Sequence, residues 1–221
     1  MKNEFKYELH CHTGCVSRCG RTEPEEIVKL YIDKGYDGIV VTDHYSPMTF
    51  KKNWCPQTQI DFYLQGYRRM KAAAPENFTV LLGMELRHYA TGNDYLIYGV
   101  EEDFLYSAGN LLAALEKKVY TMCKERGYLV FQAHPFRPYI IRCNPKYLDG
   151  IEVYNGKVPR SQNERALAWA KKTGKLMCSG SDFHEIENLA KGGIITSSPI
   201  KTNEDLLSVL KSQDFKRIET Y

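Results

Sequence analysis

Residues 5–12 read FKYELHCH, a short run of alternating apolar side chains that ends in two histidines separated by one cysteine. Residues 38–44, GIVVTDH, follow the same plan, because an apolar and β-branched run is again followed by an acid and a histidine. Such runs are typical of buried strands. Ligand-type side chains directly after buried strands predict a parallel sheet whose strand ends carry the chemistry.

The rest of the chain alternates between strand-like runs and helical patterns. We expect strands at residues 5–9, 38–42, 79–82, 95–100, 128–131, 150–154 and 176–179. We expect helices at residues 22–34, 60–70, 111–122 and 161–172, and a last helix after residue 202. Seven strands with interleaved helices predict an α/β fold whose parallel sheet is closed as a barrel, in a single domain spanning residues 1–221. An open doubly wound sheet is the alternative, but the glycine-rich turn expected after its first strand is missing.

The composition and the charge restrict the class of protein. Hydrophobic residues make up 43% of the chain, enough for one sizeable core, and the formal net charge is only +3. Without a block of Lys and Arg, this balance predicts no extended nucleic-acid surface and no binding to an anionic membrane. The N-terminus lacks the apolar run of a signal peptide, and no apolar stretch approaches the ~18 residues of a membrane span. We therefore expect a cytoplasmic protein whose seven cysteines are reduced thiols.

Five of the six histidines follow an expected strand. They lie in HCH at 10–12, TDH at 42–44, HP at 134–135 and SDFH at 181–184, and the acids Glu85 and Glu152 lie near other strand ends. Residues two apart in an extended segment point the same way, so His10 and His12 can bind one ion, as can Asp182 and His184. Imidazoles combined with carboxylates suit zinc, manganese or iron, and Glu85 can bridge two ions. This placement predicts a metal site.

Not every candidate residue belongs to that set. A single histidine is more often a hydrogen-bonded, partly buried side chain than a ligand, and His88 keeps this interpretation. Cys11, Cys15 and Cys19 repeat at intervals of four residues, which matches no common zinc or iron–sulfur spacing. We interpret them as inert thiols that fill space near the site.

The ordered series HxH, TDH, GxE, HP and SDxH, which runs from His10 to His184, resembles the motifs of the PHP (polymerase and histidinol phosphatase) superfamily. The resemblance covers most of the chain and implies a distorted (β/α)7 barrel. It also implies a hydrolase, a phosphoesterase that depends on two or three divalent metal ions (zinc, manganese or iron). The first ion would be held by His10, His12, Glu85 and Asp182. Glu85 would bridge to a second ion bound by His134, and His44 with His184 would hold a third ion or the substrate phosphate.

Two positions depart from the family pattern. Trinuclear members usually carry a histidine or an aspartate about six residues after the HxH pair, where this chain has Arg18. Because a cation does not bind a metal, we expect the third site to be weak or empty and Arg18 to contact the substrate phosphate, with a solvated surface arginine as the alternative. The usual second-site histidine is also missing, and Asp94 is the expected replacement, with His88 as its competitor.

The chemistry expected of such a site is attack on phosphorus by a metal-bound hydroxide, without a covalent enzyme intermediate. His44 or His184 would protonate the leaving oxygen. The charge of the phosphoryl group would be neutralised by Arg18, Arg137 and Arg160. Asp43 and Asn155 would orient metal ligands through hydrogen bonds. The expected partner is a small phosphomonoester, such as a histidinol-phosphate-like compound or a nucleotide phosphate, and the charge balance argues against nucleic acid.

Two other functions remain open. A metal-dependent amidohydrolase or deacetylase would apply the same metal chemistry on a similar barrel. That interpretation favours a carboxylated lysine at the rim, and no lysine follows an interior strand at the expected position. The second alternative is a catalytically silent metal-binding module, which the missing ligand at position 18 favours. Metal binding without turnover would distinguish the module from an enzyme.

Overall fold

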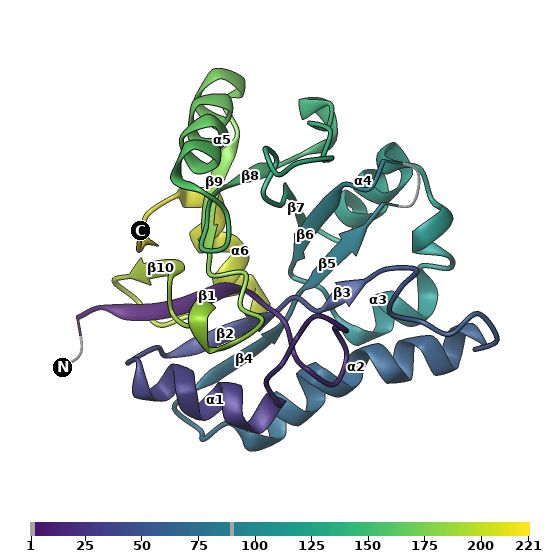
Figure 1. Ribbon diagram of the computed structural model, residues 1–221, viewed down its shortest axis with the longest axis horizontal. Coiled ribbons are helices and arrows are strands. Elements are labelled where there is room, and N and C mark those ends of the chain that lie inside the picture. Colours follow the sequence, from purple (N-terminus) through teal and green to yellow (C-terminus); the bar gives the residue numbers. More distant parts are fainter. Residues whose placement is uncertain (1–2, 89–90) are drawn as a thin grey trace.

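The structure is a computed structural model that describes residues 3–88 and 91–221. Its strands are β1 (Phe5–Cys11), β2 (Gly38–Val41), β3 (His44–Tyr45), β4 (Thr79–Leu82), β5 (Met84–Arg87), β6 (Asp94–Tyr98), β7 (Leu129–Gln132), β8 (Gly150–Asn155), β9 (Leu176–Gly180), β10 (Gly192–Thr196) and β11 (Lys216–Glu219) (Figure 1). The α-helices are α1 (Pro24–Asp33), α2 (Pro56–Ala73), α3 (Glu102–Ser107), α4 (Glu116–Glu125), α5 (Arg160–Thr173) and α6 (Asn203–Ser212). Short 3₁₀ turns lie at Leu111–Ala113, Pro145–Tyr147 and Ile186–Asn188.

The strands form two mixed sheets and not one closed sheet. The first has the order β11-β10-β1-β2-β4 and the second the order β3-β5-β6-β7-β8-β9. β1, β2 and β4 are parallel, as are β7, β8 and β9, whereas β6 is antiparallel to both of its neighbours and β10 is antiparallel to β1 and β11. The α/β class is therefore correct. Closure into one parallel barrel is not observed among the described strands.

The length of the connection between two strands explains why some neighbouring strands are antiparallel. A parallel neighbour needs a crossover connection of roughly a dozen residues or more, usually containing a helix. The link from Arg87 to Asp94 is shorter than that, so β5 and β6 form an antiparallel pair. The short β3, β5, β10 and β11 were not among the expected strands, whereas each of the seven expected runs contains a strand.

The two sheets nevertheless share one apolar interior. Leu9 and Val40 of the first sheet pack in the same cluster as Leu96 and Phe131 of the second, and all four side chains are buried. Leu210 of α6 belongs to this cluster, so α6 covers one end of the space between the sheets. Because that end is filled with apolar side chains, polar chemistry is confined to the opposite ends of the strands.

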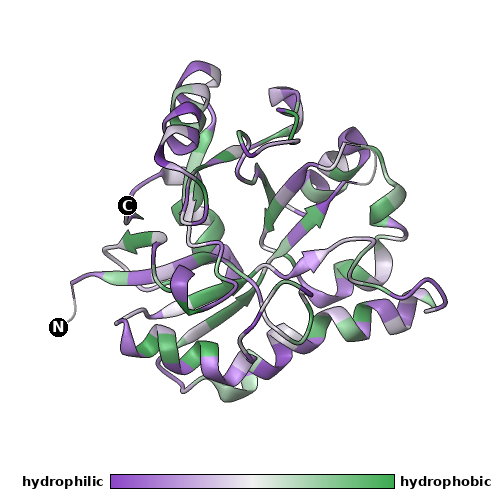
Figure 2. Ribbon diagram, viewed as in Figure 1, coloured by the Kyte–Doolittle hydropathy of each residue, from purple (hydrophilic) through white to green (hydrophobic). Residues whose placement is uncertain are grey.

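The helices α1 and α2 cover the outer face of the first sheet, below β2 and β4 in Figure 1. Both helices alternate between hydrophilic and hydrophobic stripes, as Figure 2 shows. Their apolar stripes bury Ile27 and Tyr31 of α1 and Leu64 and Met70 of α2. Burial of this kind stabilises a domain by roughly 1.5–3 kcal/mol for each large apolar side chain. Within residues 3–88 and 91–221, no helix is both long and apolar enough to cross a membrane.

Proline decides where two of the helices begin. Pro24 and Pro56 occupy the first turn of α1 and α2, where the missing N–H has no intrahelical partner to lose and the fixed φ suits a helix. α1 therefore begins at Pro24 and not at Thr22, and α2 begins four residues before Ile60. At α6 the side chain of Thr202 accepts a hydrogen bond from the backbone N–H of Asp205 and forms a capping box.

Candidate metal centre

The strand ends of both sheets bring the expected ligand residues into one cluster. These residues lie on a strand or just after one, and the structure gathers His10, His12, His44, Glu85, His134, Asp182 and His184. We call these seven residues the ligand cluster. All seven side chains are buried except that of His44, which is 19% exposed. The cluster is therefore open to solvent on the side of His44.

The first group in the cluster joins the HCH pair to two carboxylates. The Nε2 atom of His10 lies 3.3 Å from Glu85 Oε1 and 3.4 Å from Asp182 Oδ1. The Nε2 atom of His12 lies 3.4 Å from Glu85 Oε2 and 3.3 Å from Asp182 Oδ1. Both imidazoles point at the same two carboxylates, as expected for side chains two residues apart in an extended segment.

Glu85 also reaches a second group. Its Oε1 atom lies 3.1 Å from His134 Nε2, and Asp94 Oδ2 lies 3.9 Å from the same nitrogen. The competing His88 instead hydrogen-bonds the hydroxyl of Thr91 at 3.1 Å. The structure therefore places Asp94, and not His88, beside the expected second metal position.

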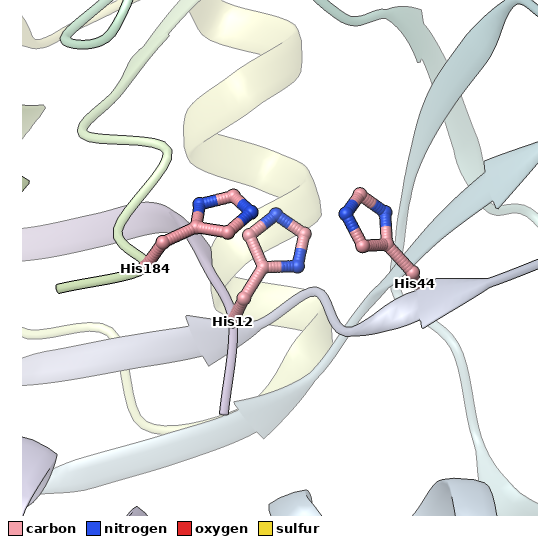
Figure 3. A group of neighbouring side chains, drawn as sticks. All are labelled: His12, His44 and His184. Carbon is pink, nitrogen blue, oxygen red and sulfur yellow. The ribbon is translucent and has the colours of Figure 1, made fainter. Parts of the chain in front are cut away.

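A third group consists of imidazoles. The ring of His12 lies between those of His44 and His184, with ring centroids 4.2 and 4.3 Å away (Figure 3). His44 and His184 are 5.8 Å apart by the same measure. His44 turns its Nδ1 atom to Glu85 Oε2 at 2.6 Å. Neutral imidazoles this close to one another are suited to a shared cation, whereas protonated rings would repel.

Unpaired buried atoms test whether a metal fits here. Among the described residues, His10 Nε2 and His12 Nε2 have no hydrogen-bond partner although they are fully buried. An unsatisfied buried polar atom costs about 1–3 kcal/mol, so native proteins rarely leave several together. Divalent cations bind imidazole nitrogens and carboxylate oxygens, and these atoms face one another. The donor set therefore fits a metal centre.

Glu152, in the middle of β8, holds two members of the cluster in place. Its Oε1 atom lies 2.7 Å from His10 Nδ1, and its Oε2 atom accepts a hydrogen bond of 2.8 Å from the backbone N–H of His134. Asn155 donates to Glu152 Oε2 at 3.0 Å and to Asp182 Oδ2 at 3.2 Å. A carboxylate on Nδ1 fixes the tautomer that leaves Nε2 free for a metal. The sequence marks Glu152 as a strand-end acid but does not reveal this role.

Asp43 organises the loop that follows β1. Its carboxylate accepts hydrogen bonds of 2.7 Å from the Thr13 backbone, the Thr13 hydroxyl and the Ser17 hydroxyl. Ser17 Oγ in turn accepts the backbone N–H of His44 at 3.0 Å and lies 3.3 Å from His12 Nδ1. Asp43 thus acts on two histidines of the cluster through Ser17, a residue that the sequence patterns did not single out.

The protonation states within the cluster differ from residue to residue. Burial lowers the pKa of His10 and His44, but neighbouring carboxylates outweigh it and raise both pKa values well above the usual range, so these two imidazoles must release protons when a metal binds. Burial raises the pKa of Glu85, but the nearby His44 and His10 outweigh it and hold that pKa well below its usual range. Burial lowers the pKa of His12 far below its usual value, and the neighbouring His44 and His184 add to the effect. Glu85 therefore stays ionised and His12 stays neutral, which are the states in which these side chains bind metals.

Two residues of the ligand cluster have a strained backbone, and a third residue packs closely against the cluster. His134 and Asp182 adopt positive φ angles of 27° and 52°, which cost non-glycine residues about 1 kcal/mol or more each. Gly180 lies against His10, because a Cβ at this position would be 2.4 Å from the His10 Cβ. Strained residues held by a rigid surrounding are typical of sites where the side-chain direction matters.

A family model for the PHP domain matches residues 8–176, and a model described as PHP-associated matches residues 160–215. The chain belongs to the PHP family. This family consists of metal-dependent hydrolases, and the PHP match includes five of the six histidines in the chain. One curated relative of this PHP chain is an error-prone DNA polymerase from Hahella chejuensis, 33% identical over 92 residues. That match covers 41% of this chain and only 8% of the polymerase.

Solved structures share the PHP fold at low sequence identity. PsfC from Pseudomonas syringae matches with a TM-score of 0.72 and 15% identity, over 99% of this chain and 93% of PsfC. A structure described as a metal-dependent phosphoesterase from Bifidobacterium adolescentis gives a TM-score of 0.54 and 16% identity, covering 93% and 95% of the two chains. These identities support a common fold and leave the substrate open.

One neighbour corrects an expectation about partners. Endonuclease Q, solved with a 27-mer duplex that carries an abasic lesion at the active site, matches with a TM-score of 0.64 and 13% identity, over 95% of this PHP chain and 57% of its own. The expectation that this fold offers no nucleic-acid surface is therefore wrong, because a protein of the same fold acts on a DNA duplex, and the expected small phosphorylated partner is not confirmed. A balanced net charge does not exclude nucleic acid for this fold.

The three expected phosphate-binding arginines of the PHP chain differ in position. Arg18 and Arg137 are exposed, and the Arg137 backbone N–H donates to His134 O at 3.0 Å, so Arg137 follows directly from the cluster. Arg160 instead donates to Glu164 one turn along α5 at 2.9 Å. Arg160 is therefore already paired with an acid of its own helix.

Proposed function

We propose that this protein hydrolyses phosphate esters at the ligand cluster. The observation that carries the proposal is the convergence of His10 Nε2 and His12 Nε2, both buried and unpaired, on the carboxylates of Glu85 and Asp182. A buried donor set of this composition is suited to a cluster of zinc, manganese or iron. Either two or three ions are compatible with the groups present.

Each residue of the cluster has a place in this proposal. His10, His12, Glu85 and Asp182 would hold the first ion. Glu85 would share a second with His134 and Asp94. Bound divalent ions would supply a water nucleophile at neutral pH and neutralise charge on the phosphoryl group.

The surrounding side chains position the substrate and the ligands. His44 and His184 stand on the open side of the cluster, where they would either bind a further ion or donate a proton to the leaving oxygen. Exposed Arg18 and Arg137 would contact the non-bridging phosphate oxygens, because guanidinium groups match their geometry. Asp43 and Asn155 keep the ligands oriented through the hydrogen bonds described above.

The test is phosphate release by metal-reconstituted protein from a panel of phosphate esters. The panel contains nucleoside monophosphates, histidinol phosphate and 5′-phosphorylated oligonucleotides, and an acetylated amide serves as the non-phosphate substrate. Asp182→Asn, which keeps the side-chain volume but removes a ligand charge, should lower turnover by roughly 100-fold or more. Asp103→Asn, on an exposed carboxylate of α3, is the matched control and should keep full activity.

The outcomes separate the competing functions. Metal-dependent phosphate release that Asp182→Asn abolishes would establish a phosphoesterase. Cleavage of the amide without phosphate release would support the amidohydrolase instead. Stoichiometric metal binding with no turnover on any substrate would support a silent metal-binding module.

A further inference from the structure

The segment that joins β7 to β8 carries positive charge and follows directly from the ligand cluster. It lies at the outer edge of the molecule in Figure 1, and residues 133–148 contain two arginines and one lysine but no acid. The backbone N–H of the first arginine, Arg137, donates to His134 O at 3.0 Å. The positive charge of this segment therefore begins beside a candidate metal ligand.

Hydrogen bonds to buried side chains fix both ends of this segment. At the far end, Gln132 accepts the backbone N–H of Cys143 and donates to Ile141 O, both at 2.8 Å. Asn93 Oδ1 accepts the backbone N–H of Ile141 at 2.9 Å. At the near end, the backbone N–H of His134 donates to a buried carboxylate of β8. The residues between these attachments are therefore presented in a fixed arrangement.

Two arginines of this region share one aromatic ring and have no acidic partner. The guanidinium carbons of Arg142 and Arg165 lie 5.1 and 4.4 Å from the centre of the Phe136 ring. Arg142 belongs to the segment, whereas Arg165 comes from α5. In the described ranges, 3–88 and 91–221, neither guanidinium group has a hydrogen bond or an ion pair. Both side chains are exposed, so a ligand can reach them.

Unpaired positive charges so close together indicate an anionic ligand. Because both guanidinium groups lie against one ring, they are within about a Debye length of each other, roughly 10 Å at 0.1 M salt, and they repel. The exposed Arg68 and Arg126 instead pair with Glu102 and Asp103. A phosphate group bound by the two unpaired arginines would replace repulsion by attraction, and a guanidinium plane matches two phosphate oxygens.

Tyr139 adds an exposed aromatic ring to the same segment. It lies between Arg137 and Arg142 in the sequence, and its side chain is 99% exposed. Its backbone has a φ of 69°, in the left-handed region that is unfavourable for a residue with a Cβ. Strain of this kind is typical of functional positions. A flat ring presented to solvent among arginines is suited to stacking on a nucleobase.

We propose that Phe136, Tyr139, Arg142 and Arg165 form a docking surface for a single nucleic-acid strand. We call these four residues the arginine–tyrosine patch. Its two arginines, held by Phe136, bind phosphates of the strand, and Tyr139 stacks on a base. This inference rests on the proposed function, because it names a polynucleotide as the phosphate ester that reaches the ligand cluster.

Other anionic partners fit the arginine–tyrosine patch less well. Membrane binding through basic side chains uses clusters of about 4–8 Lys and Arg residues, more than this segment and α5 bring together here. An acidic peptide would pair with the arginines and leave Tyr139 without a stacking partner. A nucleic-acid strand supplies both the phosphates and the flat groups.

The test measures binding of a fluorescein-labelled, single-stranded phosphorothioate oligonucleotide to the metal-reconstituted full-length chain, by fluorescence anisotropy at several salt concentrations. The phosphorothioate backbone keeps its charge and resists hydrolysis. Each phosphate contact on a single strand contributes about 0.7 to the slope of log affinity against log salt. The double variant Arg142→Gln, Arg165→Gln should therefore lower the slope by about 1.4 and weaken binding about tenfold or more. Tyr139→Ala should weaken binding about fivefold or more at an unchanged slope.

Matched variants control for charge and for loss of a tyrosine. The double variant Arg68→Gln, Arg126→Gln removes the same charge from two exposed arginines on α2 and at the end of α4, and should keep the wild-type slope. Tyr106→Ala, at an exposed tyrosine of α3, should keep the wild-type affinity.

Each result decides the proposal. A lower slope only in the Arg142 and Arg165 variant, with weaker binding at unchanged slope in Tyr139→Ala, would support it. Equal losses in the control pair would overturn it, because net charge alone would then govern binding. A wild type that does not bind the oligonucleotide would also overturn it. So would patch-dependent binding to phosphatidylserine vesicles or to polyglutamate that is tighter than binding to the oligonucleotide.

Phosphate release from a small phosphomonoester is measured with the same variants. It should stay at the wild-type level, because the arginine–tyrosine patch contains no residue of the ligand cluster. Patch-dependent strand binding without hydrolysis of any phosphate ester would refute the proposed phosphoesterase alone. Phosphate release without strand binding would refute the docking surface alone.

Discussion

The substitution Glu152→Gln tests whether the cluster depends on its orienting carboxylate. Glu152 is buried and uses one oxygen for His10 Nδ1 at 2.7 Å and the other for the His134 backbone N–H at 2.8 Å. Glutamine has nearly the same shape but only one accepting oxygen. One of these two donors must therefore face an NH₂ group, and the negative charge that favours the N–H on His10 Nδ1 disappears.

The expected loss follows from these contacts. Removing an orienting partner of a metal-binding histidine typically weakens metal affinity by about 10- to 100-fold, or about 1.4–2.8 kcal/mol. In the metal-free protein, the glutamine NH₂ group would face another hydrogen-bond donor in the buried site. This unsatisfied contact should lower the free energy of unfolding by about 1–3 kcal/mol. Both effects should appear together, because the same oxygen atoms serve the ligand geometry and the packing of β8 against the cluster.

The assay is competition for zinc against a chromogenic chelator, with urea unfolding of the metal-free protein measured in parallel. Glu164→Gln is the matched control, since Glu164 is an exposed acid of α5 that pairs with Arg160. This control should change neither quantity by more than about 0.5 kcal/mol. A zinc affinity of Glu152→Gln within twofold of the wild type would refute the orienting role, whatever happens to stability.

Three further predictions test the metal, the packing of the site and the core. Metal at ~100 times its Kd should raise the free energy of unfolding by about 2.7 kcal/mol over chelated protein, and equal thermal midpoints would contradict a folded-state metal site. Gly180→Ala places a methyl group 2.4 Å from the His10 Cβ, so metal affinity measured by titration should fall about tenfold or more; an unchanged affinity would mean that His10 tolerates displacement. Leu64→Ala, in the buried stripe of α2, should cost about 2–5 kcal/mol in urea unfolding, whereas the exposed Met48→Ala should cost under about 0.5 kcal/mol.

The division into two sheets depends on a feature that a pattern of apolar residues does not encode. Residues 79–87 read TVLLGMELR, in which Gly83 separates β4 of the first sheet from β5 of the second. A Cβ at Gly83 would lie 2.8 Å from the Val40 side chain, so the glycine lets the chain pass close to β2 as it changes sheets. The sequence predicts one strand here, because the change of partner is set by neighbours that are distant in the chain.

The ligand residues were easier to predict than the residues that orient them. Each ligand motif follows a strand, and strand ends meet regardless of the details of register. Ser17 and Glu152 act through particular ring nitrogens of His12 and His10, and no spacing rule relates residues so far apart. The sequence can therefore predict which candidate ligands gather at the strand ends, whereas the groups that set their tautomers depend on three-dimensional packing.

Counting along a loop also fails to identify which side chain turns inward. The six-residue spacing directs attention to Arg18, yet the side chains of both Arg18 and the next residue, Cys19, are exposed. In a strand, alternation fixes the direction of each side chain, but a tight turn shifts that direction with each change of φ and ψ. Of the three cysteines spaced by four residues, Cys11 is buried, Cys15 is partly buried and Cys19 is exposed.

The net charge of the chain did not predict whether this fold can bind nucleic acid, because net charge does not describe where the charges lie. The total of +3 sums 30 basic and 27 acidic side chains, and many of them cancel in surface pairs such as Arg68 with Glu102 and Arg126 with Asp103. A phosphate backbone responds to the cations within about a Debye length of its path, roughly 8 Å at physiological salt, and not to the sum over the molecule. The exposed Arg18 and Arg137 are therefore more informative than the total. The slope of oligonucleotide affinity against salt concentration counts the phosphates that such local cations contact.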